Sequence, residues 1–483
     1  MNREIYQEPL VSRYTSPEMQ AVFSEHGKFT TWRRCWIALA EAQHELGLNN
    51  LVTKEMIAEL KAHATDINFE LAAQKEKEIR HDVMAHVYAY GQQCPTAEPI
   101  IHLGATSQFV GCNTDLLLQK QALTLVKKAL LNVMANLANF CRKHKALVTL
   151  GYTHYQPAQP TTVGKRHTLY LQDLMMDLEA IEWLEGQIKA RGVKGTVGTQ
   201  ATFLELFQGD QQKVRQLDEL VALKLGFSKV FPITSQTYTR KLDVKISEVL
   251  AGIGASAHKF AVDLRLLSNL KVQEEPFASN QVGSSAMAYK RNPMRSERMT
   301  GLARKLMGLV PNFYATYANQ WLERSLDDSA IRRMDIPQAF LLTDAILRLY
   351  MNITSDMVVY PQQIAKHLHQ ELPFMATEKI LMVAVRQGAS RQKMHEIIKI
   401  HSVAAGKKVK EEAADNDLLI RLAADPAMGF SLAELKAMVA DPAEFAGRAE
   451  AQTEEFLIEE VEPRLAGYRE LLKEEEVESN LQV

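Results

Sequence analysis

Helical periodicity over unusually long segments is the feature that most constrains this chain. From Asn113 the sequence reads NTDLLLQKQALTLVKKALLNVMANLANFCRKHKAL, in which an Asn/Thr cap precedes apolar residues at helical spacing. Similar patterns cover residues 164–191 and 240–270. Each is far longer than an average globular helix of about 11–12 residues. The sequence therefore predicts a bundle of long helices.

A fourth helical segment runs from residue 294 towards residue 357. It contains Pro311 and Pro337, which we expect to kink or break the helix because proline removes a backbone hydrogen bond. Several of these helices stay apolar on more than one side. One chain cannot cover such faces, so we expect burial against sister subunits.

The pattern predicts an all-α fold of three domains. The chain has 483 residues, and domains average about 150 residues. We assign an N-terminal helical domain to residues 1–110, the central long-helix bundle to residues 111–362, and a C-terminal helical domain to residues 363–483.

Charge and cysteine usage narrow the function classes. The 56 Lys and Arg nearly balance the 58 Asp and Glu, so we expect neither nucleic-acid nor membrane binding. The amino terminus has no apolar run, and four widely spaced cysteines form no disulfide-like framework. We expect a cytoplasmic protein.

Two polar stretches contain histidines that could carry chemistry. Arg80-His81-Asp82 lies in a helical pattern and, taken alone, fits a solvated helix face better than a site. In THYQPAQ, His154 follows Thr153 where a helix is entered or left. Its ring could titrate in a cleft, or it could cap a helix end, which its position alone slightly favours.

Two glycine-bearing loops are ambiguous. Residues 191–200, RGVKGTVGTQ, lack the Gly-Lys-Ser/Thr of a phosphate loop. A mobile turn, or a backbone that closely approaches another part of the molecule, fits this stretch better. Residues 283–293, GSSAMAYKRNP, place Lys290 and Asn292 near paired serines. This arrangement could depress a serine hydroxyl pKa, or it could be a solvated hinge loop.

The second loop resembles the signature loop of the fumarase/aspartase superfamily, written S-S-x-M-P-x-K-x-N. The segments SRYTSPEM, RHDVMAHV, IHLGATS, VKGTVGTQA, TSQTYTRK, MRSER and LDDSAIRR also resemble the branch that acts on succinylated purine nucleotides. The likeness covers about residues 10–460. Ala288 replaces the usual proline, which leaves the loop less stiff but removes no reacting group.

The resemblance implies a carbon–nitrogen lyase that eliminates fumarate from its substrate by anti β-elimination. By this resemblance Ser284 is the base, Lys290 stabilises the charge that develops, and His154 is the general acid, which Glu297 orients. His81 is expected near the bond that breaks.

The resemblance also implies a substrate-binding set. For the succinyl end it contains Thr106, Ser107, Gln236, Lys290 and Asn292. For the nucleotide end and the scissile region it contains Arg13, Tyr14, Arg80, His81, Asp82, Arg298, Arg324, Ser329 and Arg333. Arginines suit phosphate because their planar fork meets its oxygens in pairs.

The resemblance further implies a homotetramer in which three chains contribute to each site, with no cofactor and no metal. Fumarase, argininosuccinate lyase and aspartase share the signature loop and are the alternatives. The nucleotide-end arginines favour a nucleotide substrate over these. A catalytically inactive helical scaffold is the alternative from another class.

Overall fold

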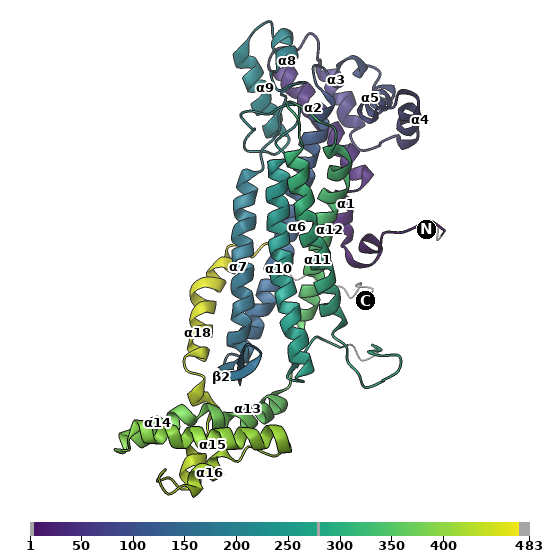
Figure 1. Ribbon diagram of the computed structural model, residues 1–483. Coiled ribbons are helices and arrows are strands. Elements are labelled where there is room, and N and C mark those ends of the chain that lie inside the picture. Colours follow the sequence, from purple (N-terminus) through teal and green to yellow (C-terminus); the bar gives the residue numbers. More distant parts are fainter. Residues whose placement is uncertain (1–3, 278–280, 473–483) are drawn as a thin grey trace.

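A computed structural model describes residues 4–277 and 281–472 and is almost entirely helical. Five long helices run side by side along the middle of an elongated molecule (Figure 1). They are α6 (Ser107–Lys143), α7 (Val163–Gln187), α10 (Lys241–Asn269), α11 (Met294–Ala318) and α12 (Asp328–Ser355). The predicted all-α fold with a long-helix bundle is confirmed.

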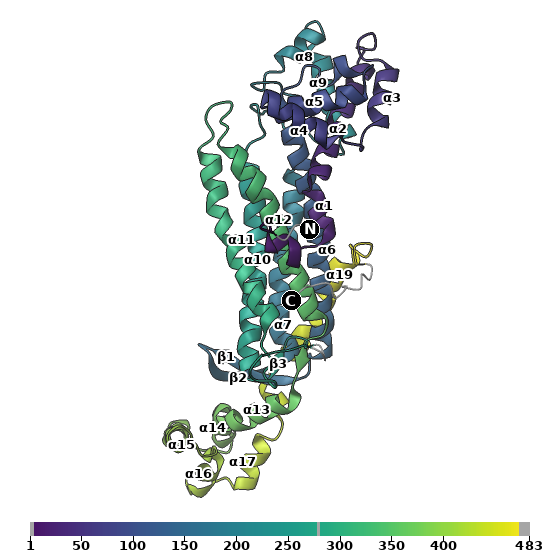
Figure 2. The ribbon, with the colours of Figure 1, turned by 90° about the vertical axis from the view of Figure 1, so that its right-hand side faces the viewer.

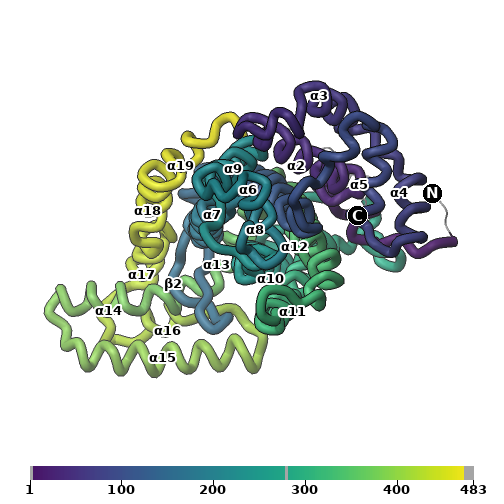
Figure 3. Tube along the Cα trace, turned by 90° about the horizontal axis from the view of Figure 1, so that it is seen from above, coloured from purple at the N-terminus to yellow at the C-terminus, as the bar shows by residue number. Residues whose placement is uncertain are grey.

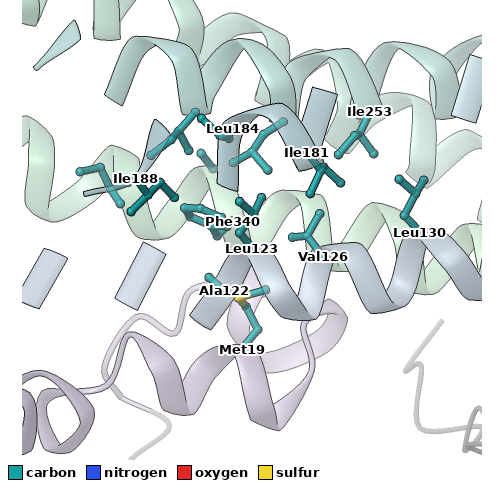
Figure 4. Close-up of a cluster of buried hydrophobic side chains, with 14 of the residues drawn as sticks. Met19, Ala122, Leu123, Val126, Leu130, Ile181, Leu184, Ile188, Ile253 and Phe340 are labelled. Atoms are coloured by element: carbon teal, nitrogen blue, oxygen red, sulfur yellow. The ribbon is translucent and has the colours of Figure 1, made fainter. Parts of the chain in front are cut away.

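The bundle core is apolar and draws on several helices. Met19, Ala122, Leu123, Ile181 and Phe340 are all fully buried and lie together in Figure 4. They come from α1 (Pro17–Val22), α6, α7 and α12. Burial of such side chains at about 25 cal/mol per Å² is the main force holding the helices together.

Smaller helices cover both ends of the bundle (Figures 1 and 2). One end carries α2 (Glu25–Glu45), α3 (Lys54–Ala62), α4 (Phe69–Ile79), α5 (Asp82–Gln93), the 3-10 turn η2 (Glu98–Ile100), α8 (Ala201–Leu206) and α9 (Gln211–Lys224). We call it the N-terminal end. The opposite end, which we call the hairpin end, carries α13 (Pro361–Met375), α14 (Thr377–Arg386), α15 (Arg391–Glu412), α16 (Leu418–Ala424) and α17 (Leu432–Met438).

The C-terminal part of the described chain first forms a small core of its own and then returns to the bundle. A separate small core holds α14 to α17 together, including Ile380, Leu418 and Leu435. After the 3-10 turn η3 (Pro442–Phe445), α18 (Ala449–Phe456), the π-helix η4 (Leu457–Val461) and α19 (Glu462–Ala466) follow. In Figure 3 they lie along α7 and α6, and Leu457 and Val461 join the bundle core. The predicted domain boundaries stay a prediction.

Four short strands interrupt the helices. β1 (Val148–Thr153) and β2 (Gln156–Thr162) form an antiparallel hairpin directly after α6. β3 (Gln273–Glu274) follows α10 and pairs with β4 (Val358–Val359), which follows α12. Both pairs therefore lie at the hairpin end of the bundle, as Figure 2 shows.

The structure corrects two expectations, one about where the first long helix begins and one about where the fourth helical segment breaks. α6 begins at Ser107, and Asn113 is not its cap: the buried Asn113 amide bonds the backbone of Gly192 through both its oxygen and its nitrogen. Pro311 and Pro337 lie inside α11 and α12, and the break falls between them, at residues 319–327.

Candidate active site

The predicted site residues lie in four separate places in one chain. A first group lies at the N-terminal end, around the starts of α5, α6 and α12. Arg13 and Tyr14 lie partway along the bundle. His154 and the loop of residues 281–293 each occupy a position at the hairpin end.

His81 and Asp82 connect three segments at the N-terminal end. His81 caps α5, its Nδ1 accepting the Met84 amide at 3.3 Å, so the imidazole proton lies on Nε2. Nε2 lies 3.3 Å from Ser107 Oγ at the start of α6. Asp82 Oδ2 accepts a hydrogen bond from Nη2 of Arg333 on α12, at 2.9 Å. The RHD triplet is therefore a helix-capping, charge-pairing element and not merely a solvated helix face.

The pKa of Asp82 is lowered despite its partial burial. Burial alone would raise it, but the Val83 amide and the charges of Arg333 and Lys28 outweigh that penalty. Asp82 is therefore ionised at neutral pH and holds the exposed Arg333 guanidinium in place.

A buried ion network fixes the neighbouring predicted residues. Asp328 is fully buried, and its two oxygens each accept a guanidinium hydrogen bond at 2.7 Å, one from Arg240 and one from Arg324. Ser329 follows directly in α12. Arg324 Nη2 is buried without a partner among the described residues, so the network leaves a donor free. Sequence reasoning missed Asp328 and Arg240, although Asp328 lies within the LDDSAIRR segment.

Gln236 is held by its backbone. Its amide donates to the Glu323 carbonyl at 3.2 Å, and its carbonyl accepts Arg191 Nη2 at 2.8 Å. The loop of residues 191–200 packs against the segment that precedes Gln236. A Cβ atom on Gly198, whose φ is +87°, would lie 2.0 Å from the Thr234 carbonyl oxygen. Of the two alternatives that the sequence left open for residues 191–200, this contact agrees with a backbone that closely approaches a neighbouring segment.

Thr106 and Arg80 also lie at the N-terminal end, whereas Arg13 and Tyr14 lie further along the bundle. Thr106 is the N-cap residue of α6, without a side-chain cap bond. Arg80 ends α4 in a left-handed conformation with φ of +52° and an exposed side chain. Arg13 and Tyr14 lie in the π-helix η1 (Leu10–Tyr14), where the Tyr14 carbonyl accepts Arg348 Nη1 at 2.8 Å. Arg348 is 15 residues beyond Arg333 on α12, about 22 Å along the helix.

His154 lies at the tip of the β1–β2 hairpin and not at a helix end, as its position in the sequence favoured. Thr153 and Gln156 are paired, and both intervening residues have left-handed backbones, with φ of +53° at His154 and +57° at Tyr155. This is the geometry of a type I′ turn, which normally uses Asn or Gly. The exposed imidazole has no hydrogen-bond partner among the described residues.

The Ser284 loop is arranged around the serine hydroxyl. Ser284 Oγ accepts the amides of Ala286 at 3.3 Å and Met287 at 3.1 Å. Asn292 Nδ2 closes the loop by donating to the Gly283 carbonyl at 2.8 Å. Amide hydrogens that point at an oxygen favour its anionic form, so this arrangement is compatible with the predicted role of Ser284.

The start of α11 holds the last predicted residues. Glu297 lies 3.8 Å from Arg265 of α10 and makes no contact with His154 within the chain. Arg298 Nη1 is buried without a partner among the described residues. The exposed Lys290 side chain has no hydrogen-bond partner within the same residues.

The length of α6 separates the predicted residues of the N-terminal end from those of the hairpin end within one chain. Its 37 residues span about 55 Å. Ser107 begins the helix beside His81, and the hairpin that bears His154 follows the other end. One chain therefore carries predicted site residues at both ends of the bundle.

Two general findings concern ligands and membranes. Across residues 4–277 and 281–472, no group of three or more His, Cys, Asp or Glu side chains is arranged to hold a metal ion. None of the helices in the described part of the chain is both long and apolar enough to cross a membrane.

Comparison with known proteins places the chain in a family. A lyase family model matches residues 13–308, and a model described as adenylosuccinate lyase C-terminus matches residues 373–456. Adenylosuccinate lyase of Schizosaccharomyces pombe is 50% identical over 98% of both chains, and that of Saccharomyces cerevisiae is 48% identical over 99% of both. A 3-carboxy-cis,cis-muconate lactonizing enzyme from Pseudomonas putida shares the fold, with a TM-score of 0.81 at 24% identity over 94% of this chain and 99% of that one. The chain belongs to the adenylosuccinate lyase family.

Proposed function

We propose that this protein removes fumarate from adenylosuccinate to give AMP, and from succinylaminoimidazole carboxamide ribotide to give aminoimidazole carboxamide ribotide. Identity of 47–50% to adenylosuccinate lyases over nearly the full length supports this carbon–nitrogen lyase activity. The observation that carries the chemistry is the Ser284 hydroxyl facing two loop amides.

Ser284 is the proposed base that takes the proton from the carbon beside one substrate carboxylate. A serine hydroxyl is normally a poor base, so its alkoxide needs stabilisation. The Ala286 and Met287 amides supply part of it. Lys290, on the same loop, supplies positive charge for the alkoxide and for the enolate-like dianion that forms.

His154 is the proposed acid that protonates the departing nitrogen from the opposite face. Imidazole is the side chain that most often transfers a proton in general acid–base catalysis. The hairpin presents the ring without a hydrogen-bond partner in the described part of the chain, so it is free to contact a group from another subunit. Glu297 of a second chain is the proposed partner that orients it.

A homotetramer in which three chains build each site would bring the separated groups together. Antiparallel contact between bundles puts the N-terminal end of one chain beside the hairpin end of another. An exposed stripe on α7 supports such contact: Leu169, Met176 and Trp183 recur every seven residues and are 50%, 62% and 51% exposed. We also place the protein in the cytoplasm, because its four buried cysteines are free thiols, as expected in a reducing compartment.

The test of the activity is an ultraviolet assay of the purified protein with adenylosuccinate, together with a fumarate measurement. Equal amounts of AMP and fumarate are expected. No turnover of adenylosuccinate combined with activity on argininosuccinate or malate would overturn the nucleotide assignment. Inactivity on all three would favour a catalytically inactive scaffold.

Arg333→Ala is expected to raise the KM for adenylosuccinate about tenfold or more, with kcat changed much less, because a charged hydrogen bond to phosphate is lost. Arg215→Ala is the matched control, since Arg215 is an exposed arginine on α9 whose only ion pair is with Glu219 among the described residues. Steady-state kinetics of both variants checks this. An unchanged KM for Arg333→Ala would contradict the phosphate contact.

A further inference from the structure

Lys28, in the first turns of α2, carries an ammonium group that the structure leaves unpaired. Its Nζ lies 4.8 Å from the ring centre of Phe29 and 5.1 Å from that of Trp32. It makes no hydrogen bond or ion pair with any residue in the described ranges. The aromatic rings hold the side chain in place, but they do not replace an anionic partner.

The carboxylates within electrostatic reach of Lys28 are already used. Asp82 is bonded to Arg333, and Asp115 of α6 is bonded to Arg332. The charges of these four residues all act on Lys28. Three cations thus share two carboxylates, which leaves one positive charge uncompensated.

The neighbouring histidine, His86, does not alter the balance of charges around Lys28. His86 stacks on Phe29 with ring centres 3.8 Å apart, and burial together with the charges of Lys28 and Arg33 lowers its pKa to about 4. It is therefore neutral at physiological pH. The pKa of Lys28 is lowered, first by burial and then by Arg333, which shows that holding the cation here without a partner is costly.

We propose that Lys28 is a further substrate-binding residue that contacts the phosphate monoester beside Arg333. A doubly charged phosphate compensates the surplus cation and offers acceptor oxygens to both side chains at once. The assignment rests on the proposed function for its substrate. Sequence reasoning missed Lys28 because it lies in an ordinary amphipathic helix pattern.

Lys28→Met tests the proposal, because methionine keeps the length of the side chain and removes its charge. AMP inhibition of adenylosuccinate turnover is expected to weaken about tenfold or more, while fumarate inhibition changes less than about twofold. KM should rise with little change in kcat, and Lys28→Arg should restore most of the affinity for AMP.

Lys75→Met is the matched control. Lys75 Nζ also lies over an aromatic ring, 4.7 Å from the centre of Tyr88, but it is hydrogen-bonded to Glu78 at 2.8 Å. This variant should leave both inhibition constants unchanged.

Three outcomes would overturn the proposal. Equal AMP inhibition in Lys28→Met and the unchanged protein would show that Lys28 does not contact the phosphate. Weaker inhibition by fumarate alone would place it at the succinyl end. Dissociation of the assembly in sedimentation would assign Lys28 to a subunit contact.

Failure of the proposed function is distinguished by titrating AMP into both proteins by calorimetry. If the unchanged protein does not turn over adenylosuccinate but binds AMP more tightly than Lys28→Met does, only the reaction is wrong. If the two proteins bind AMP equally, or neither binds it, the Lys28 site is wrong.

Discussion

Replacing His154 with asparagine is expected to lower kcat for adenylosuccinate by about 100- to 10,000-fold, since general acid catalysis contributes on that order. Asparagine tolerates the left-handed backbone that the hairpin tip requires, so the turn should remain intact. Steady-state ultraviolet assays measure the decrease in kcat, and circular dichroism checks that the variant is folded.

The control for His154 is His395→Ala, because His395 is an exposed histidine on α15 without a hydrogen-bond partner in the part of the chain that the structure describes. It should retain full activity. A kcat for His154→Asn within tenfold of the unchanged protein would reject the role of His154 as the acid.

Ser284→Ala is expected to lower kcat about a thousandfold or more, because it removes the proposed base and not only a binding contact. The bonds that Ser284 Oγ makes are to amides of its own loop, so assembly and thermal stability should change little. Steady-state kinetics and a thermal melt of the variant check both statements.

The adjacent serine provides a matched control for Ser284. Ser285 is exposed, and its hydroxyl makes no hydrogen bond to any other described residue. Ser285→Ala should therefore keep most of its activity. If Ser285→Ala lost activity and Ser284→Ala kept it, the base would be assigned to the wrong serine.

Much of the fold could be predicted because helix periodicity is a local property. The segments at residues 164–191 and 240–270 correspond closely to α7 and α10. The start of α6 was misplaced because Asn113 satisfies a cap pattern locally, whereas its amide is used by Gly192, 79 residues away. The hairpin around His154 was missed because QPAQPT reads as a loop, and pairing with β1 overrides that local preference.

The sequence supplied candidate residues for the site but not their arrangement in space. Motifs indicated the regions around His154, Ser284 and His81. No sequence pattern predicted that Asp328 accepts one hydrogen bond on each carboxylate oxygen, or that the Lys28 ammonium group lacks an anionic partner among the described residues. Such features depend on contacts between segments distant in sequence. The arrangement within one chain also leaves Glu297 beside Arg265, so the proposed Glu297–His154 pair requires a second subunit.

The most direct test of a site assembled from several chains is a mixing experiment. His154→Asn and Ser284→Ala are purified separately, mixed in equal amounts, dissociated, reassembled and assayed with adenylosuccinate. If the two residues of each site come from different chains, random mixing should restore about a quarter of the sites. Activity near that fraction is the predicted result. Activity no greater than the sum of the two separate variants, in a mixture that has formed hybrid assemblies, would contradict the account.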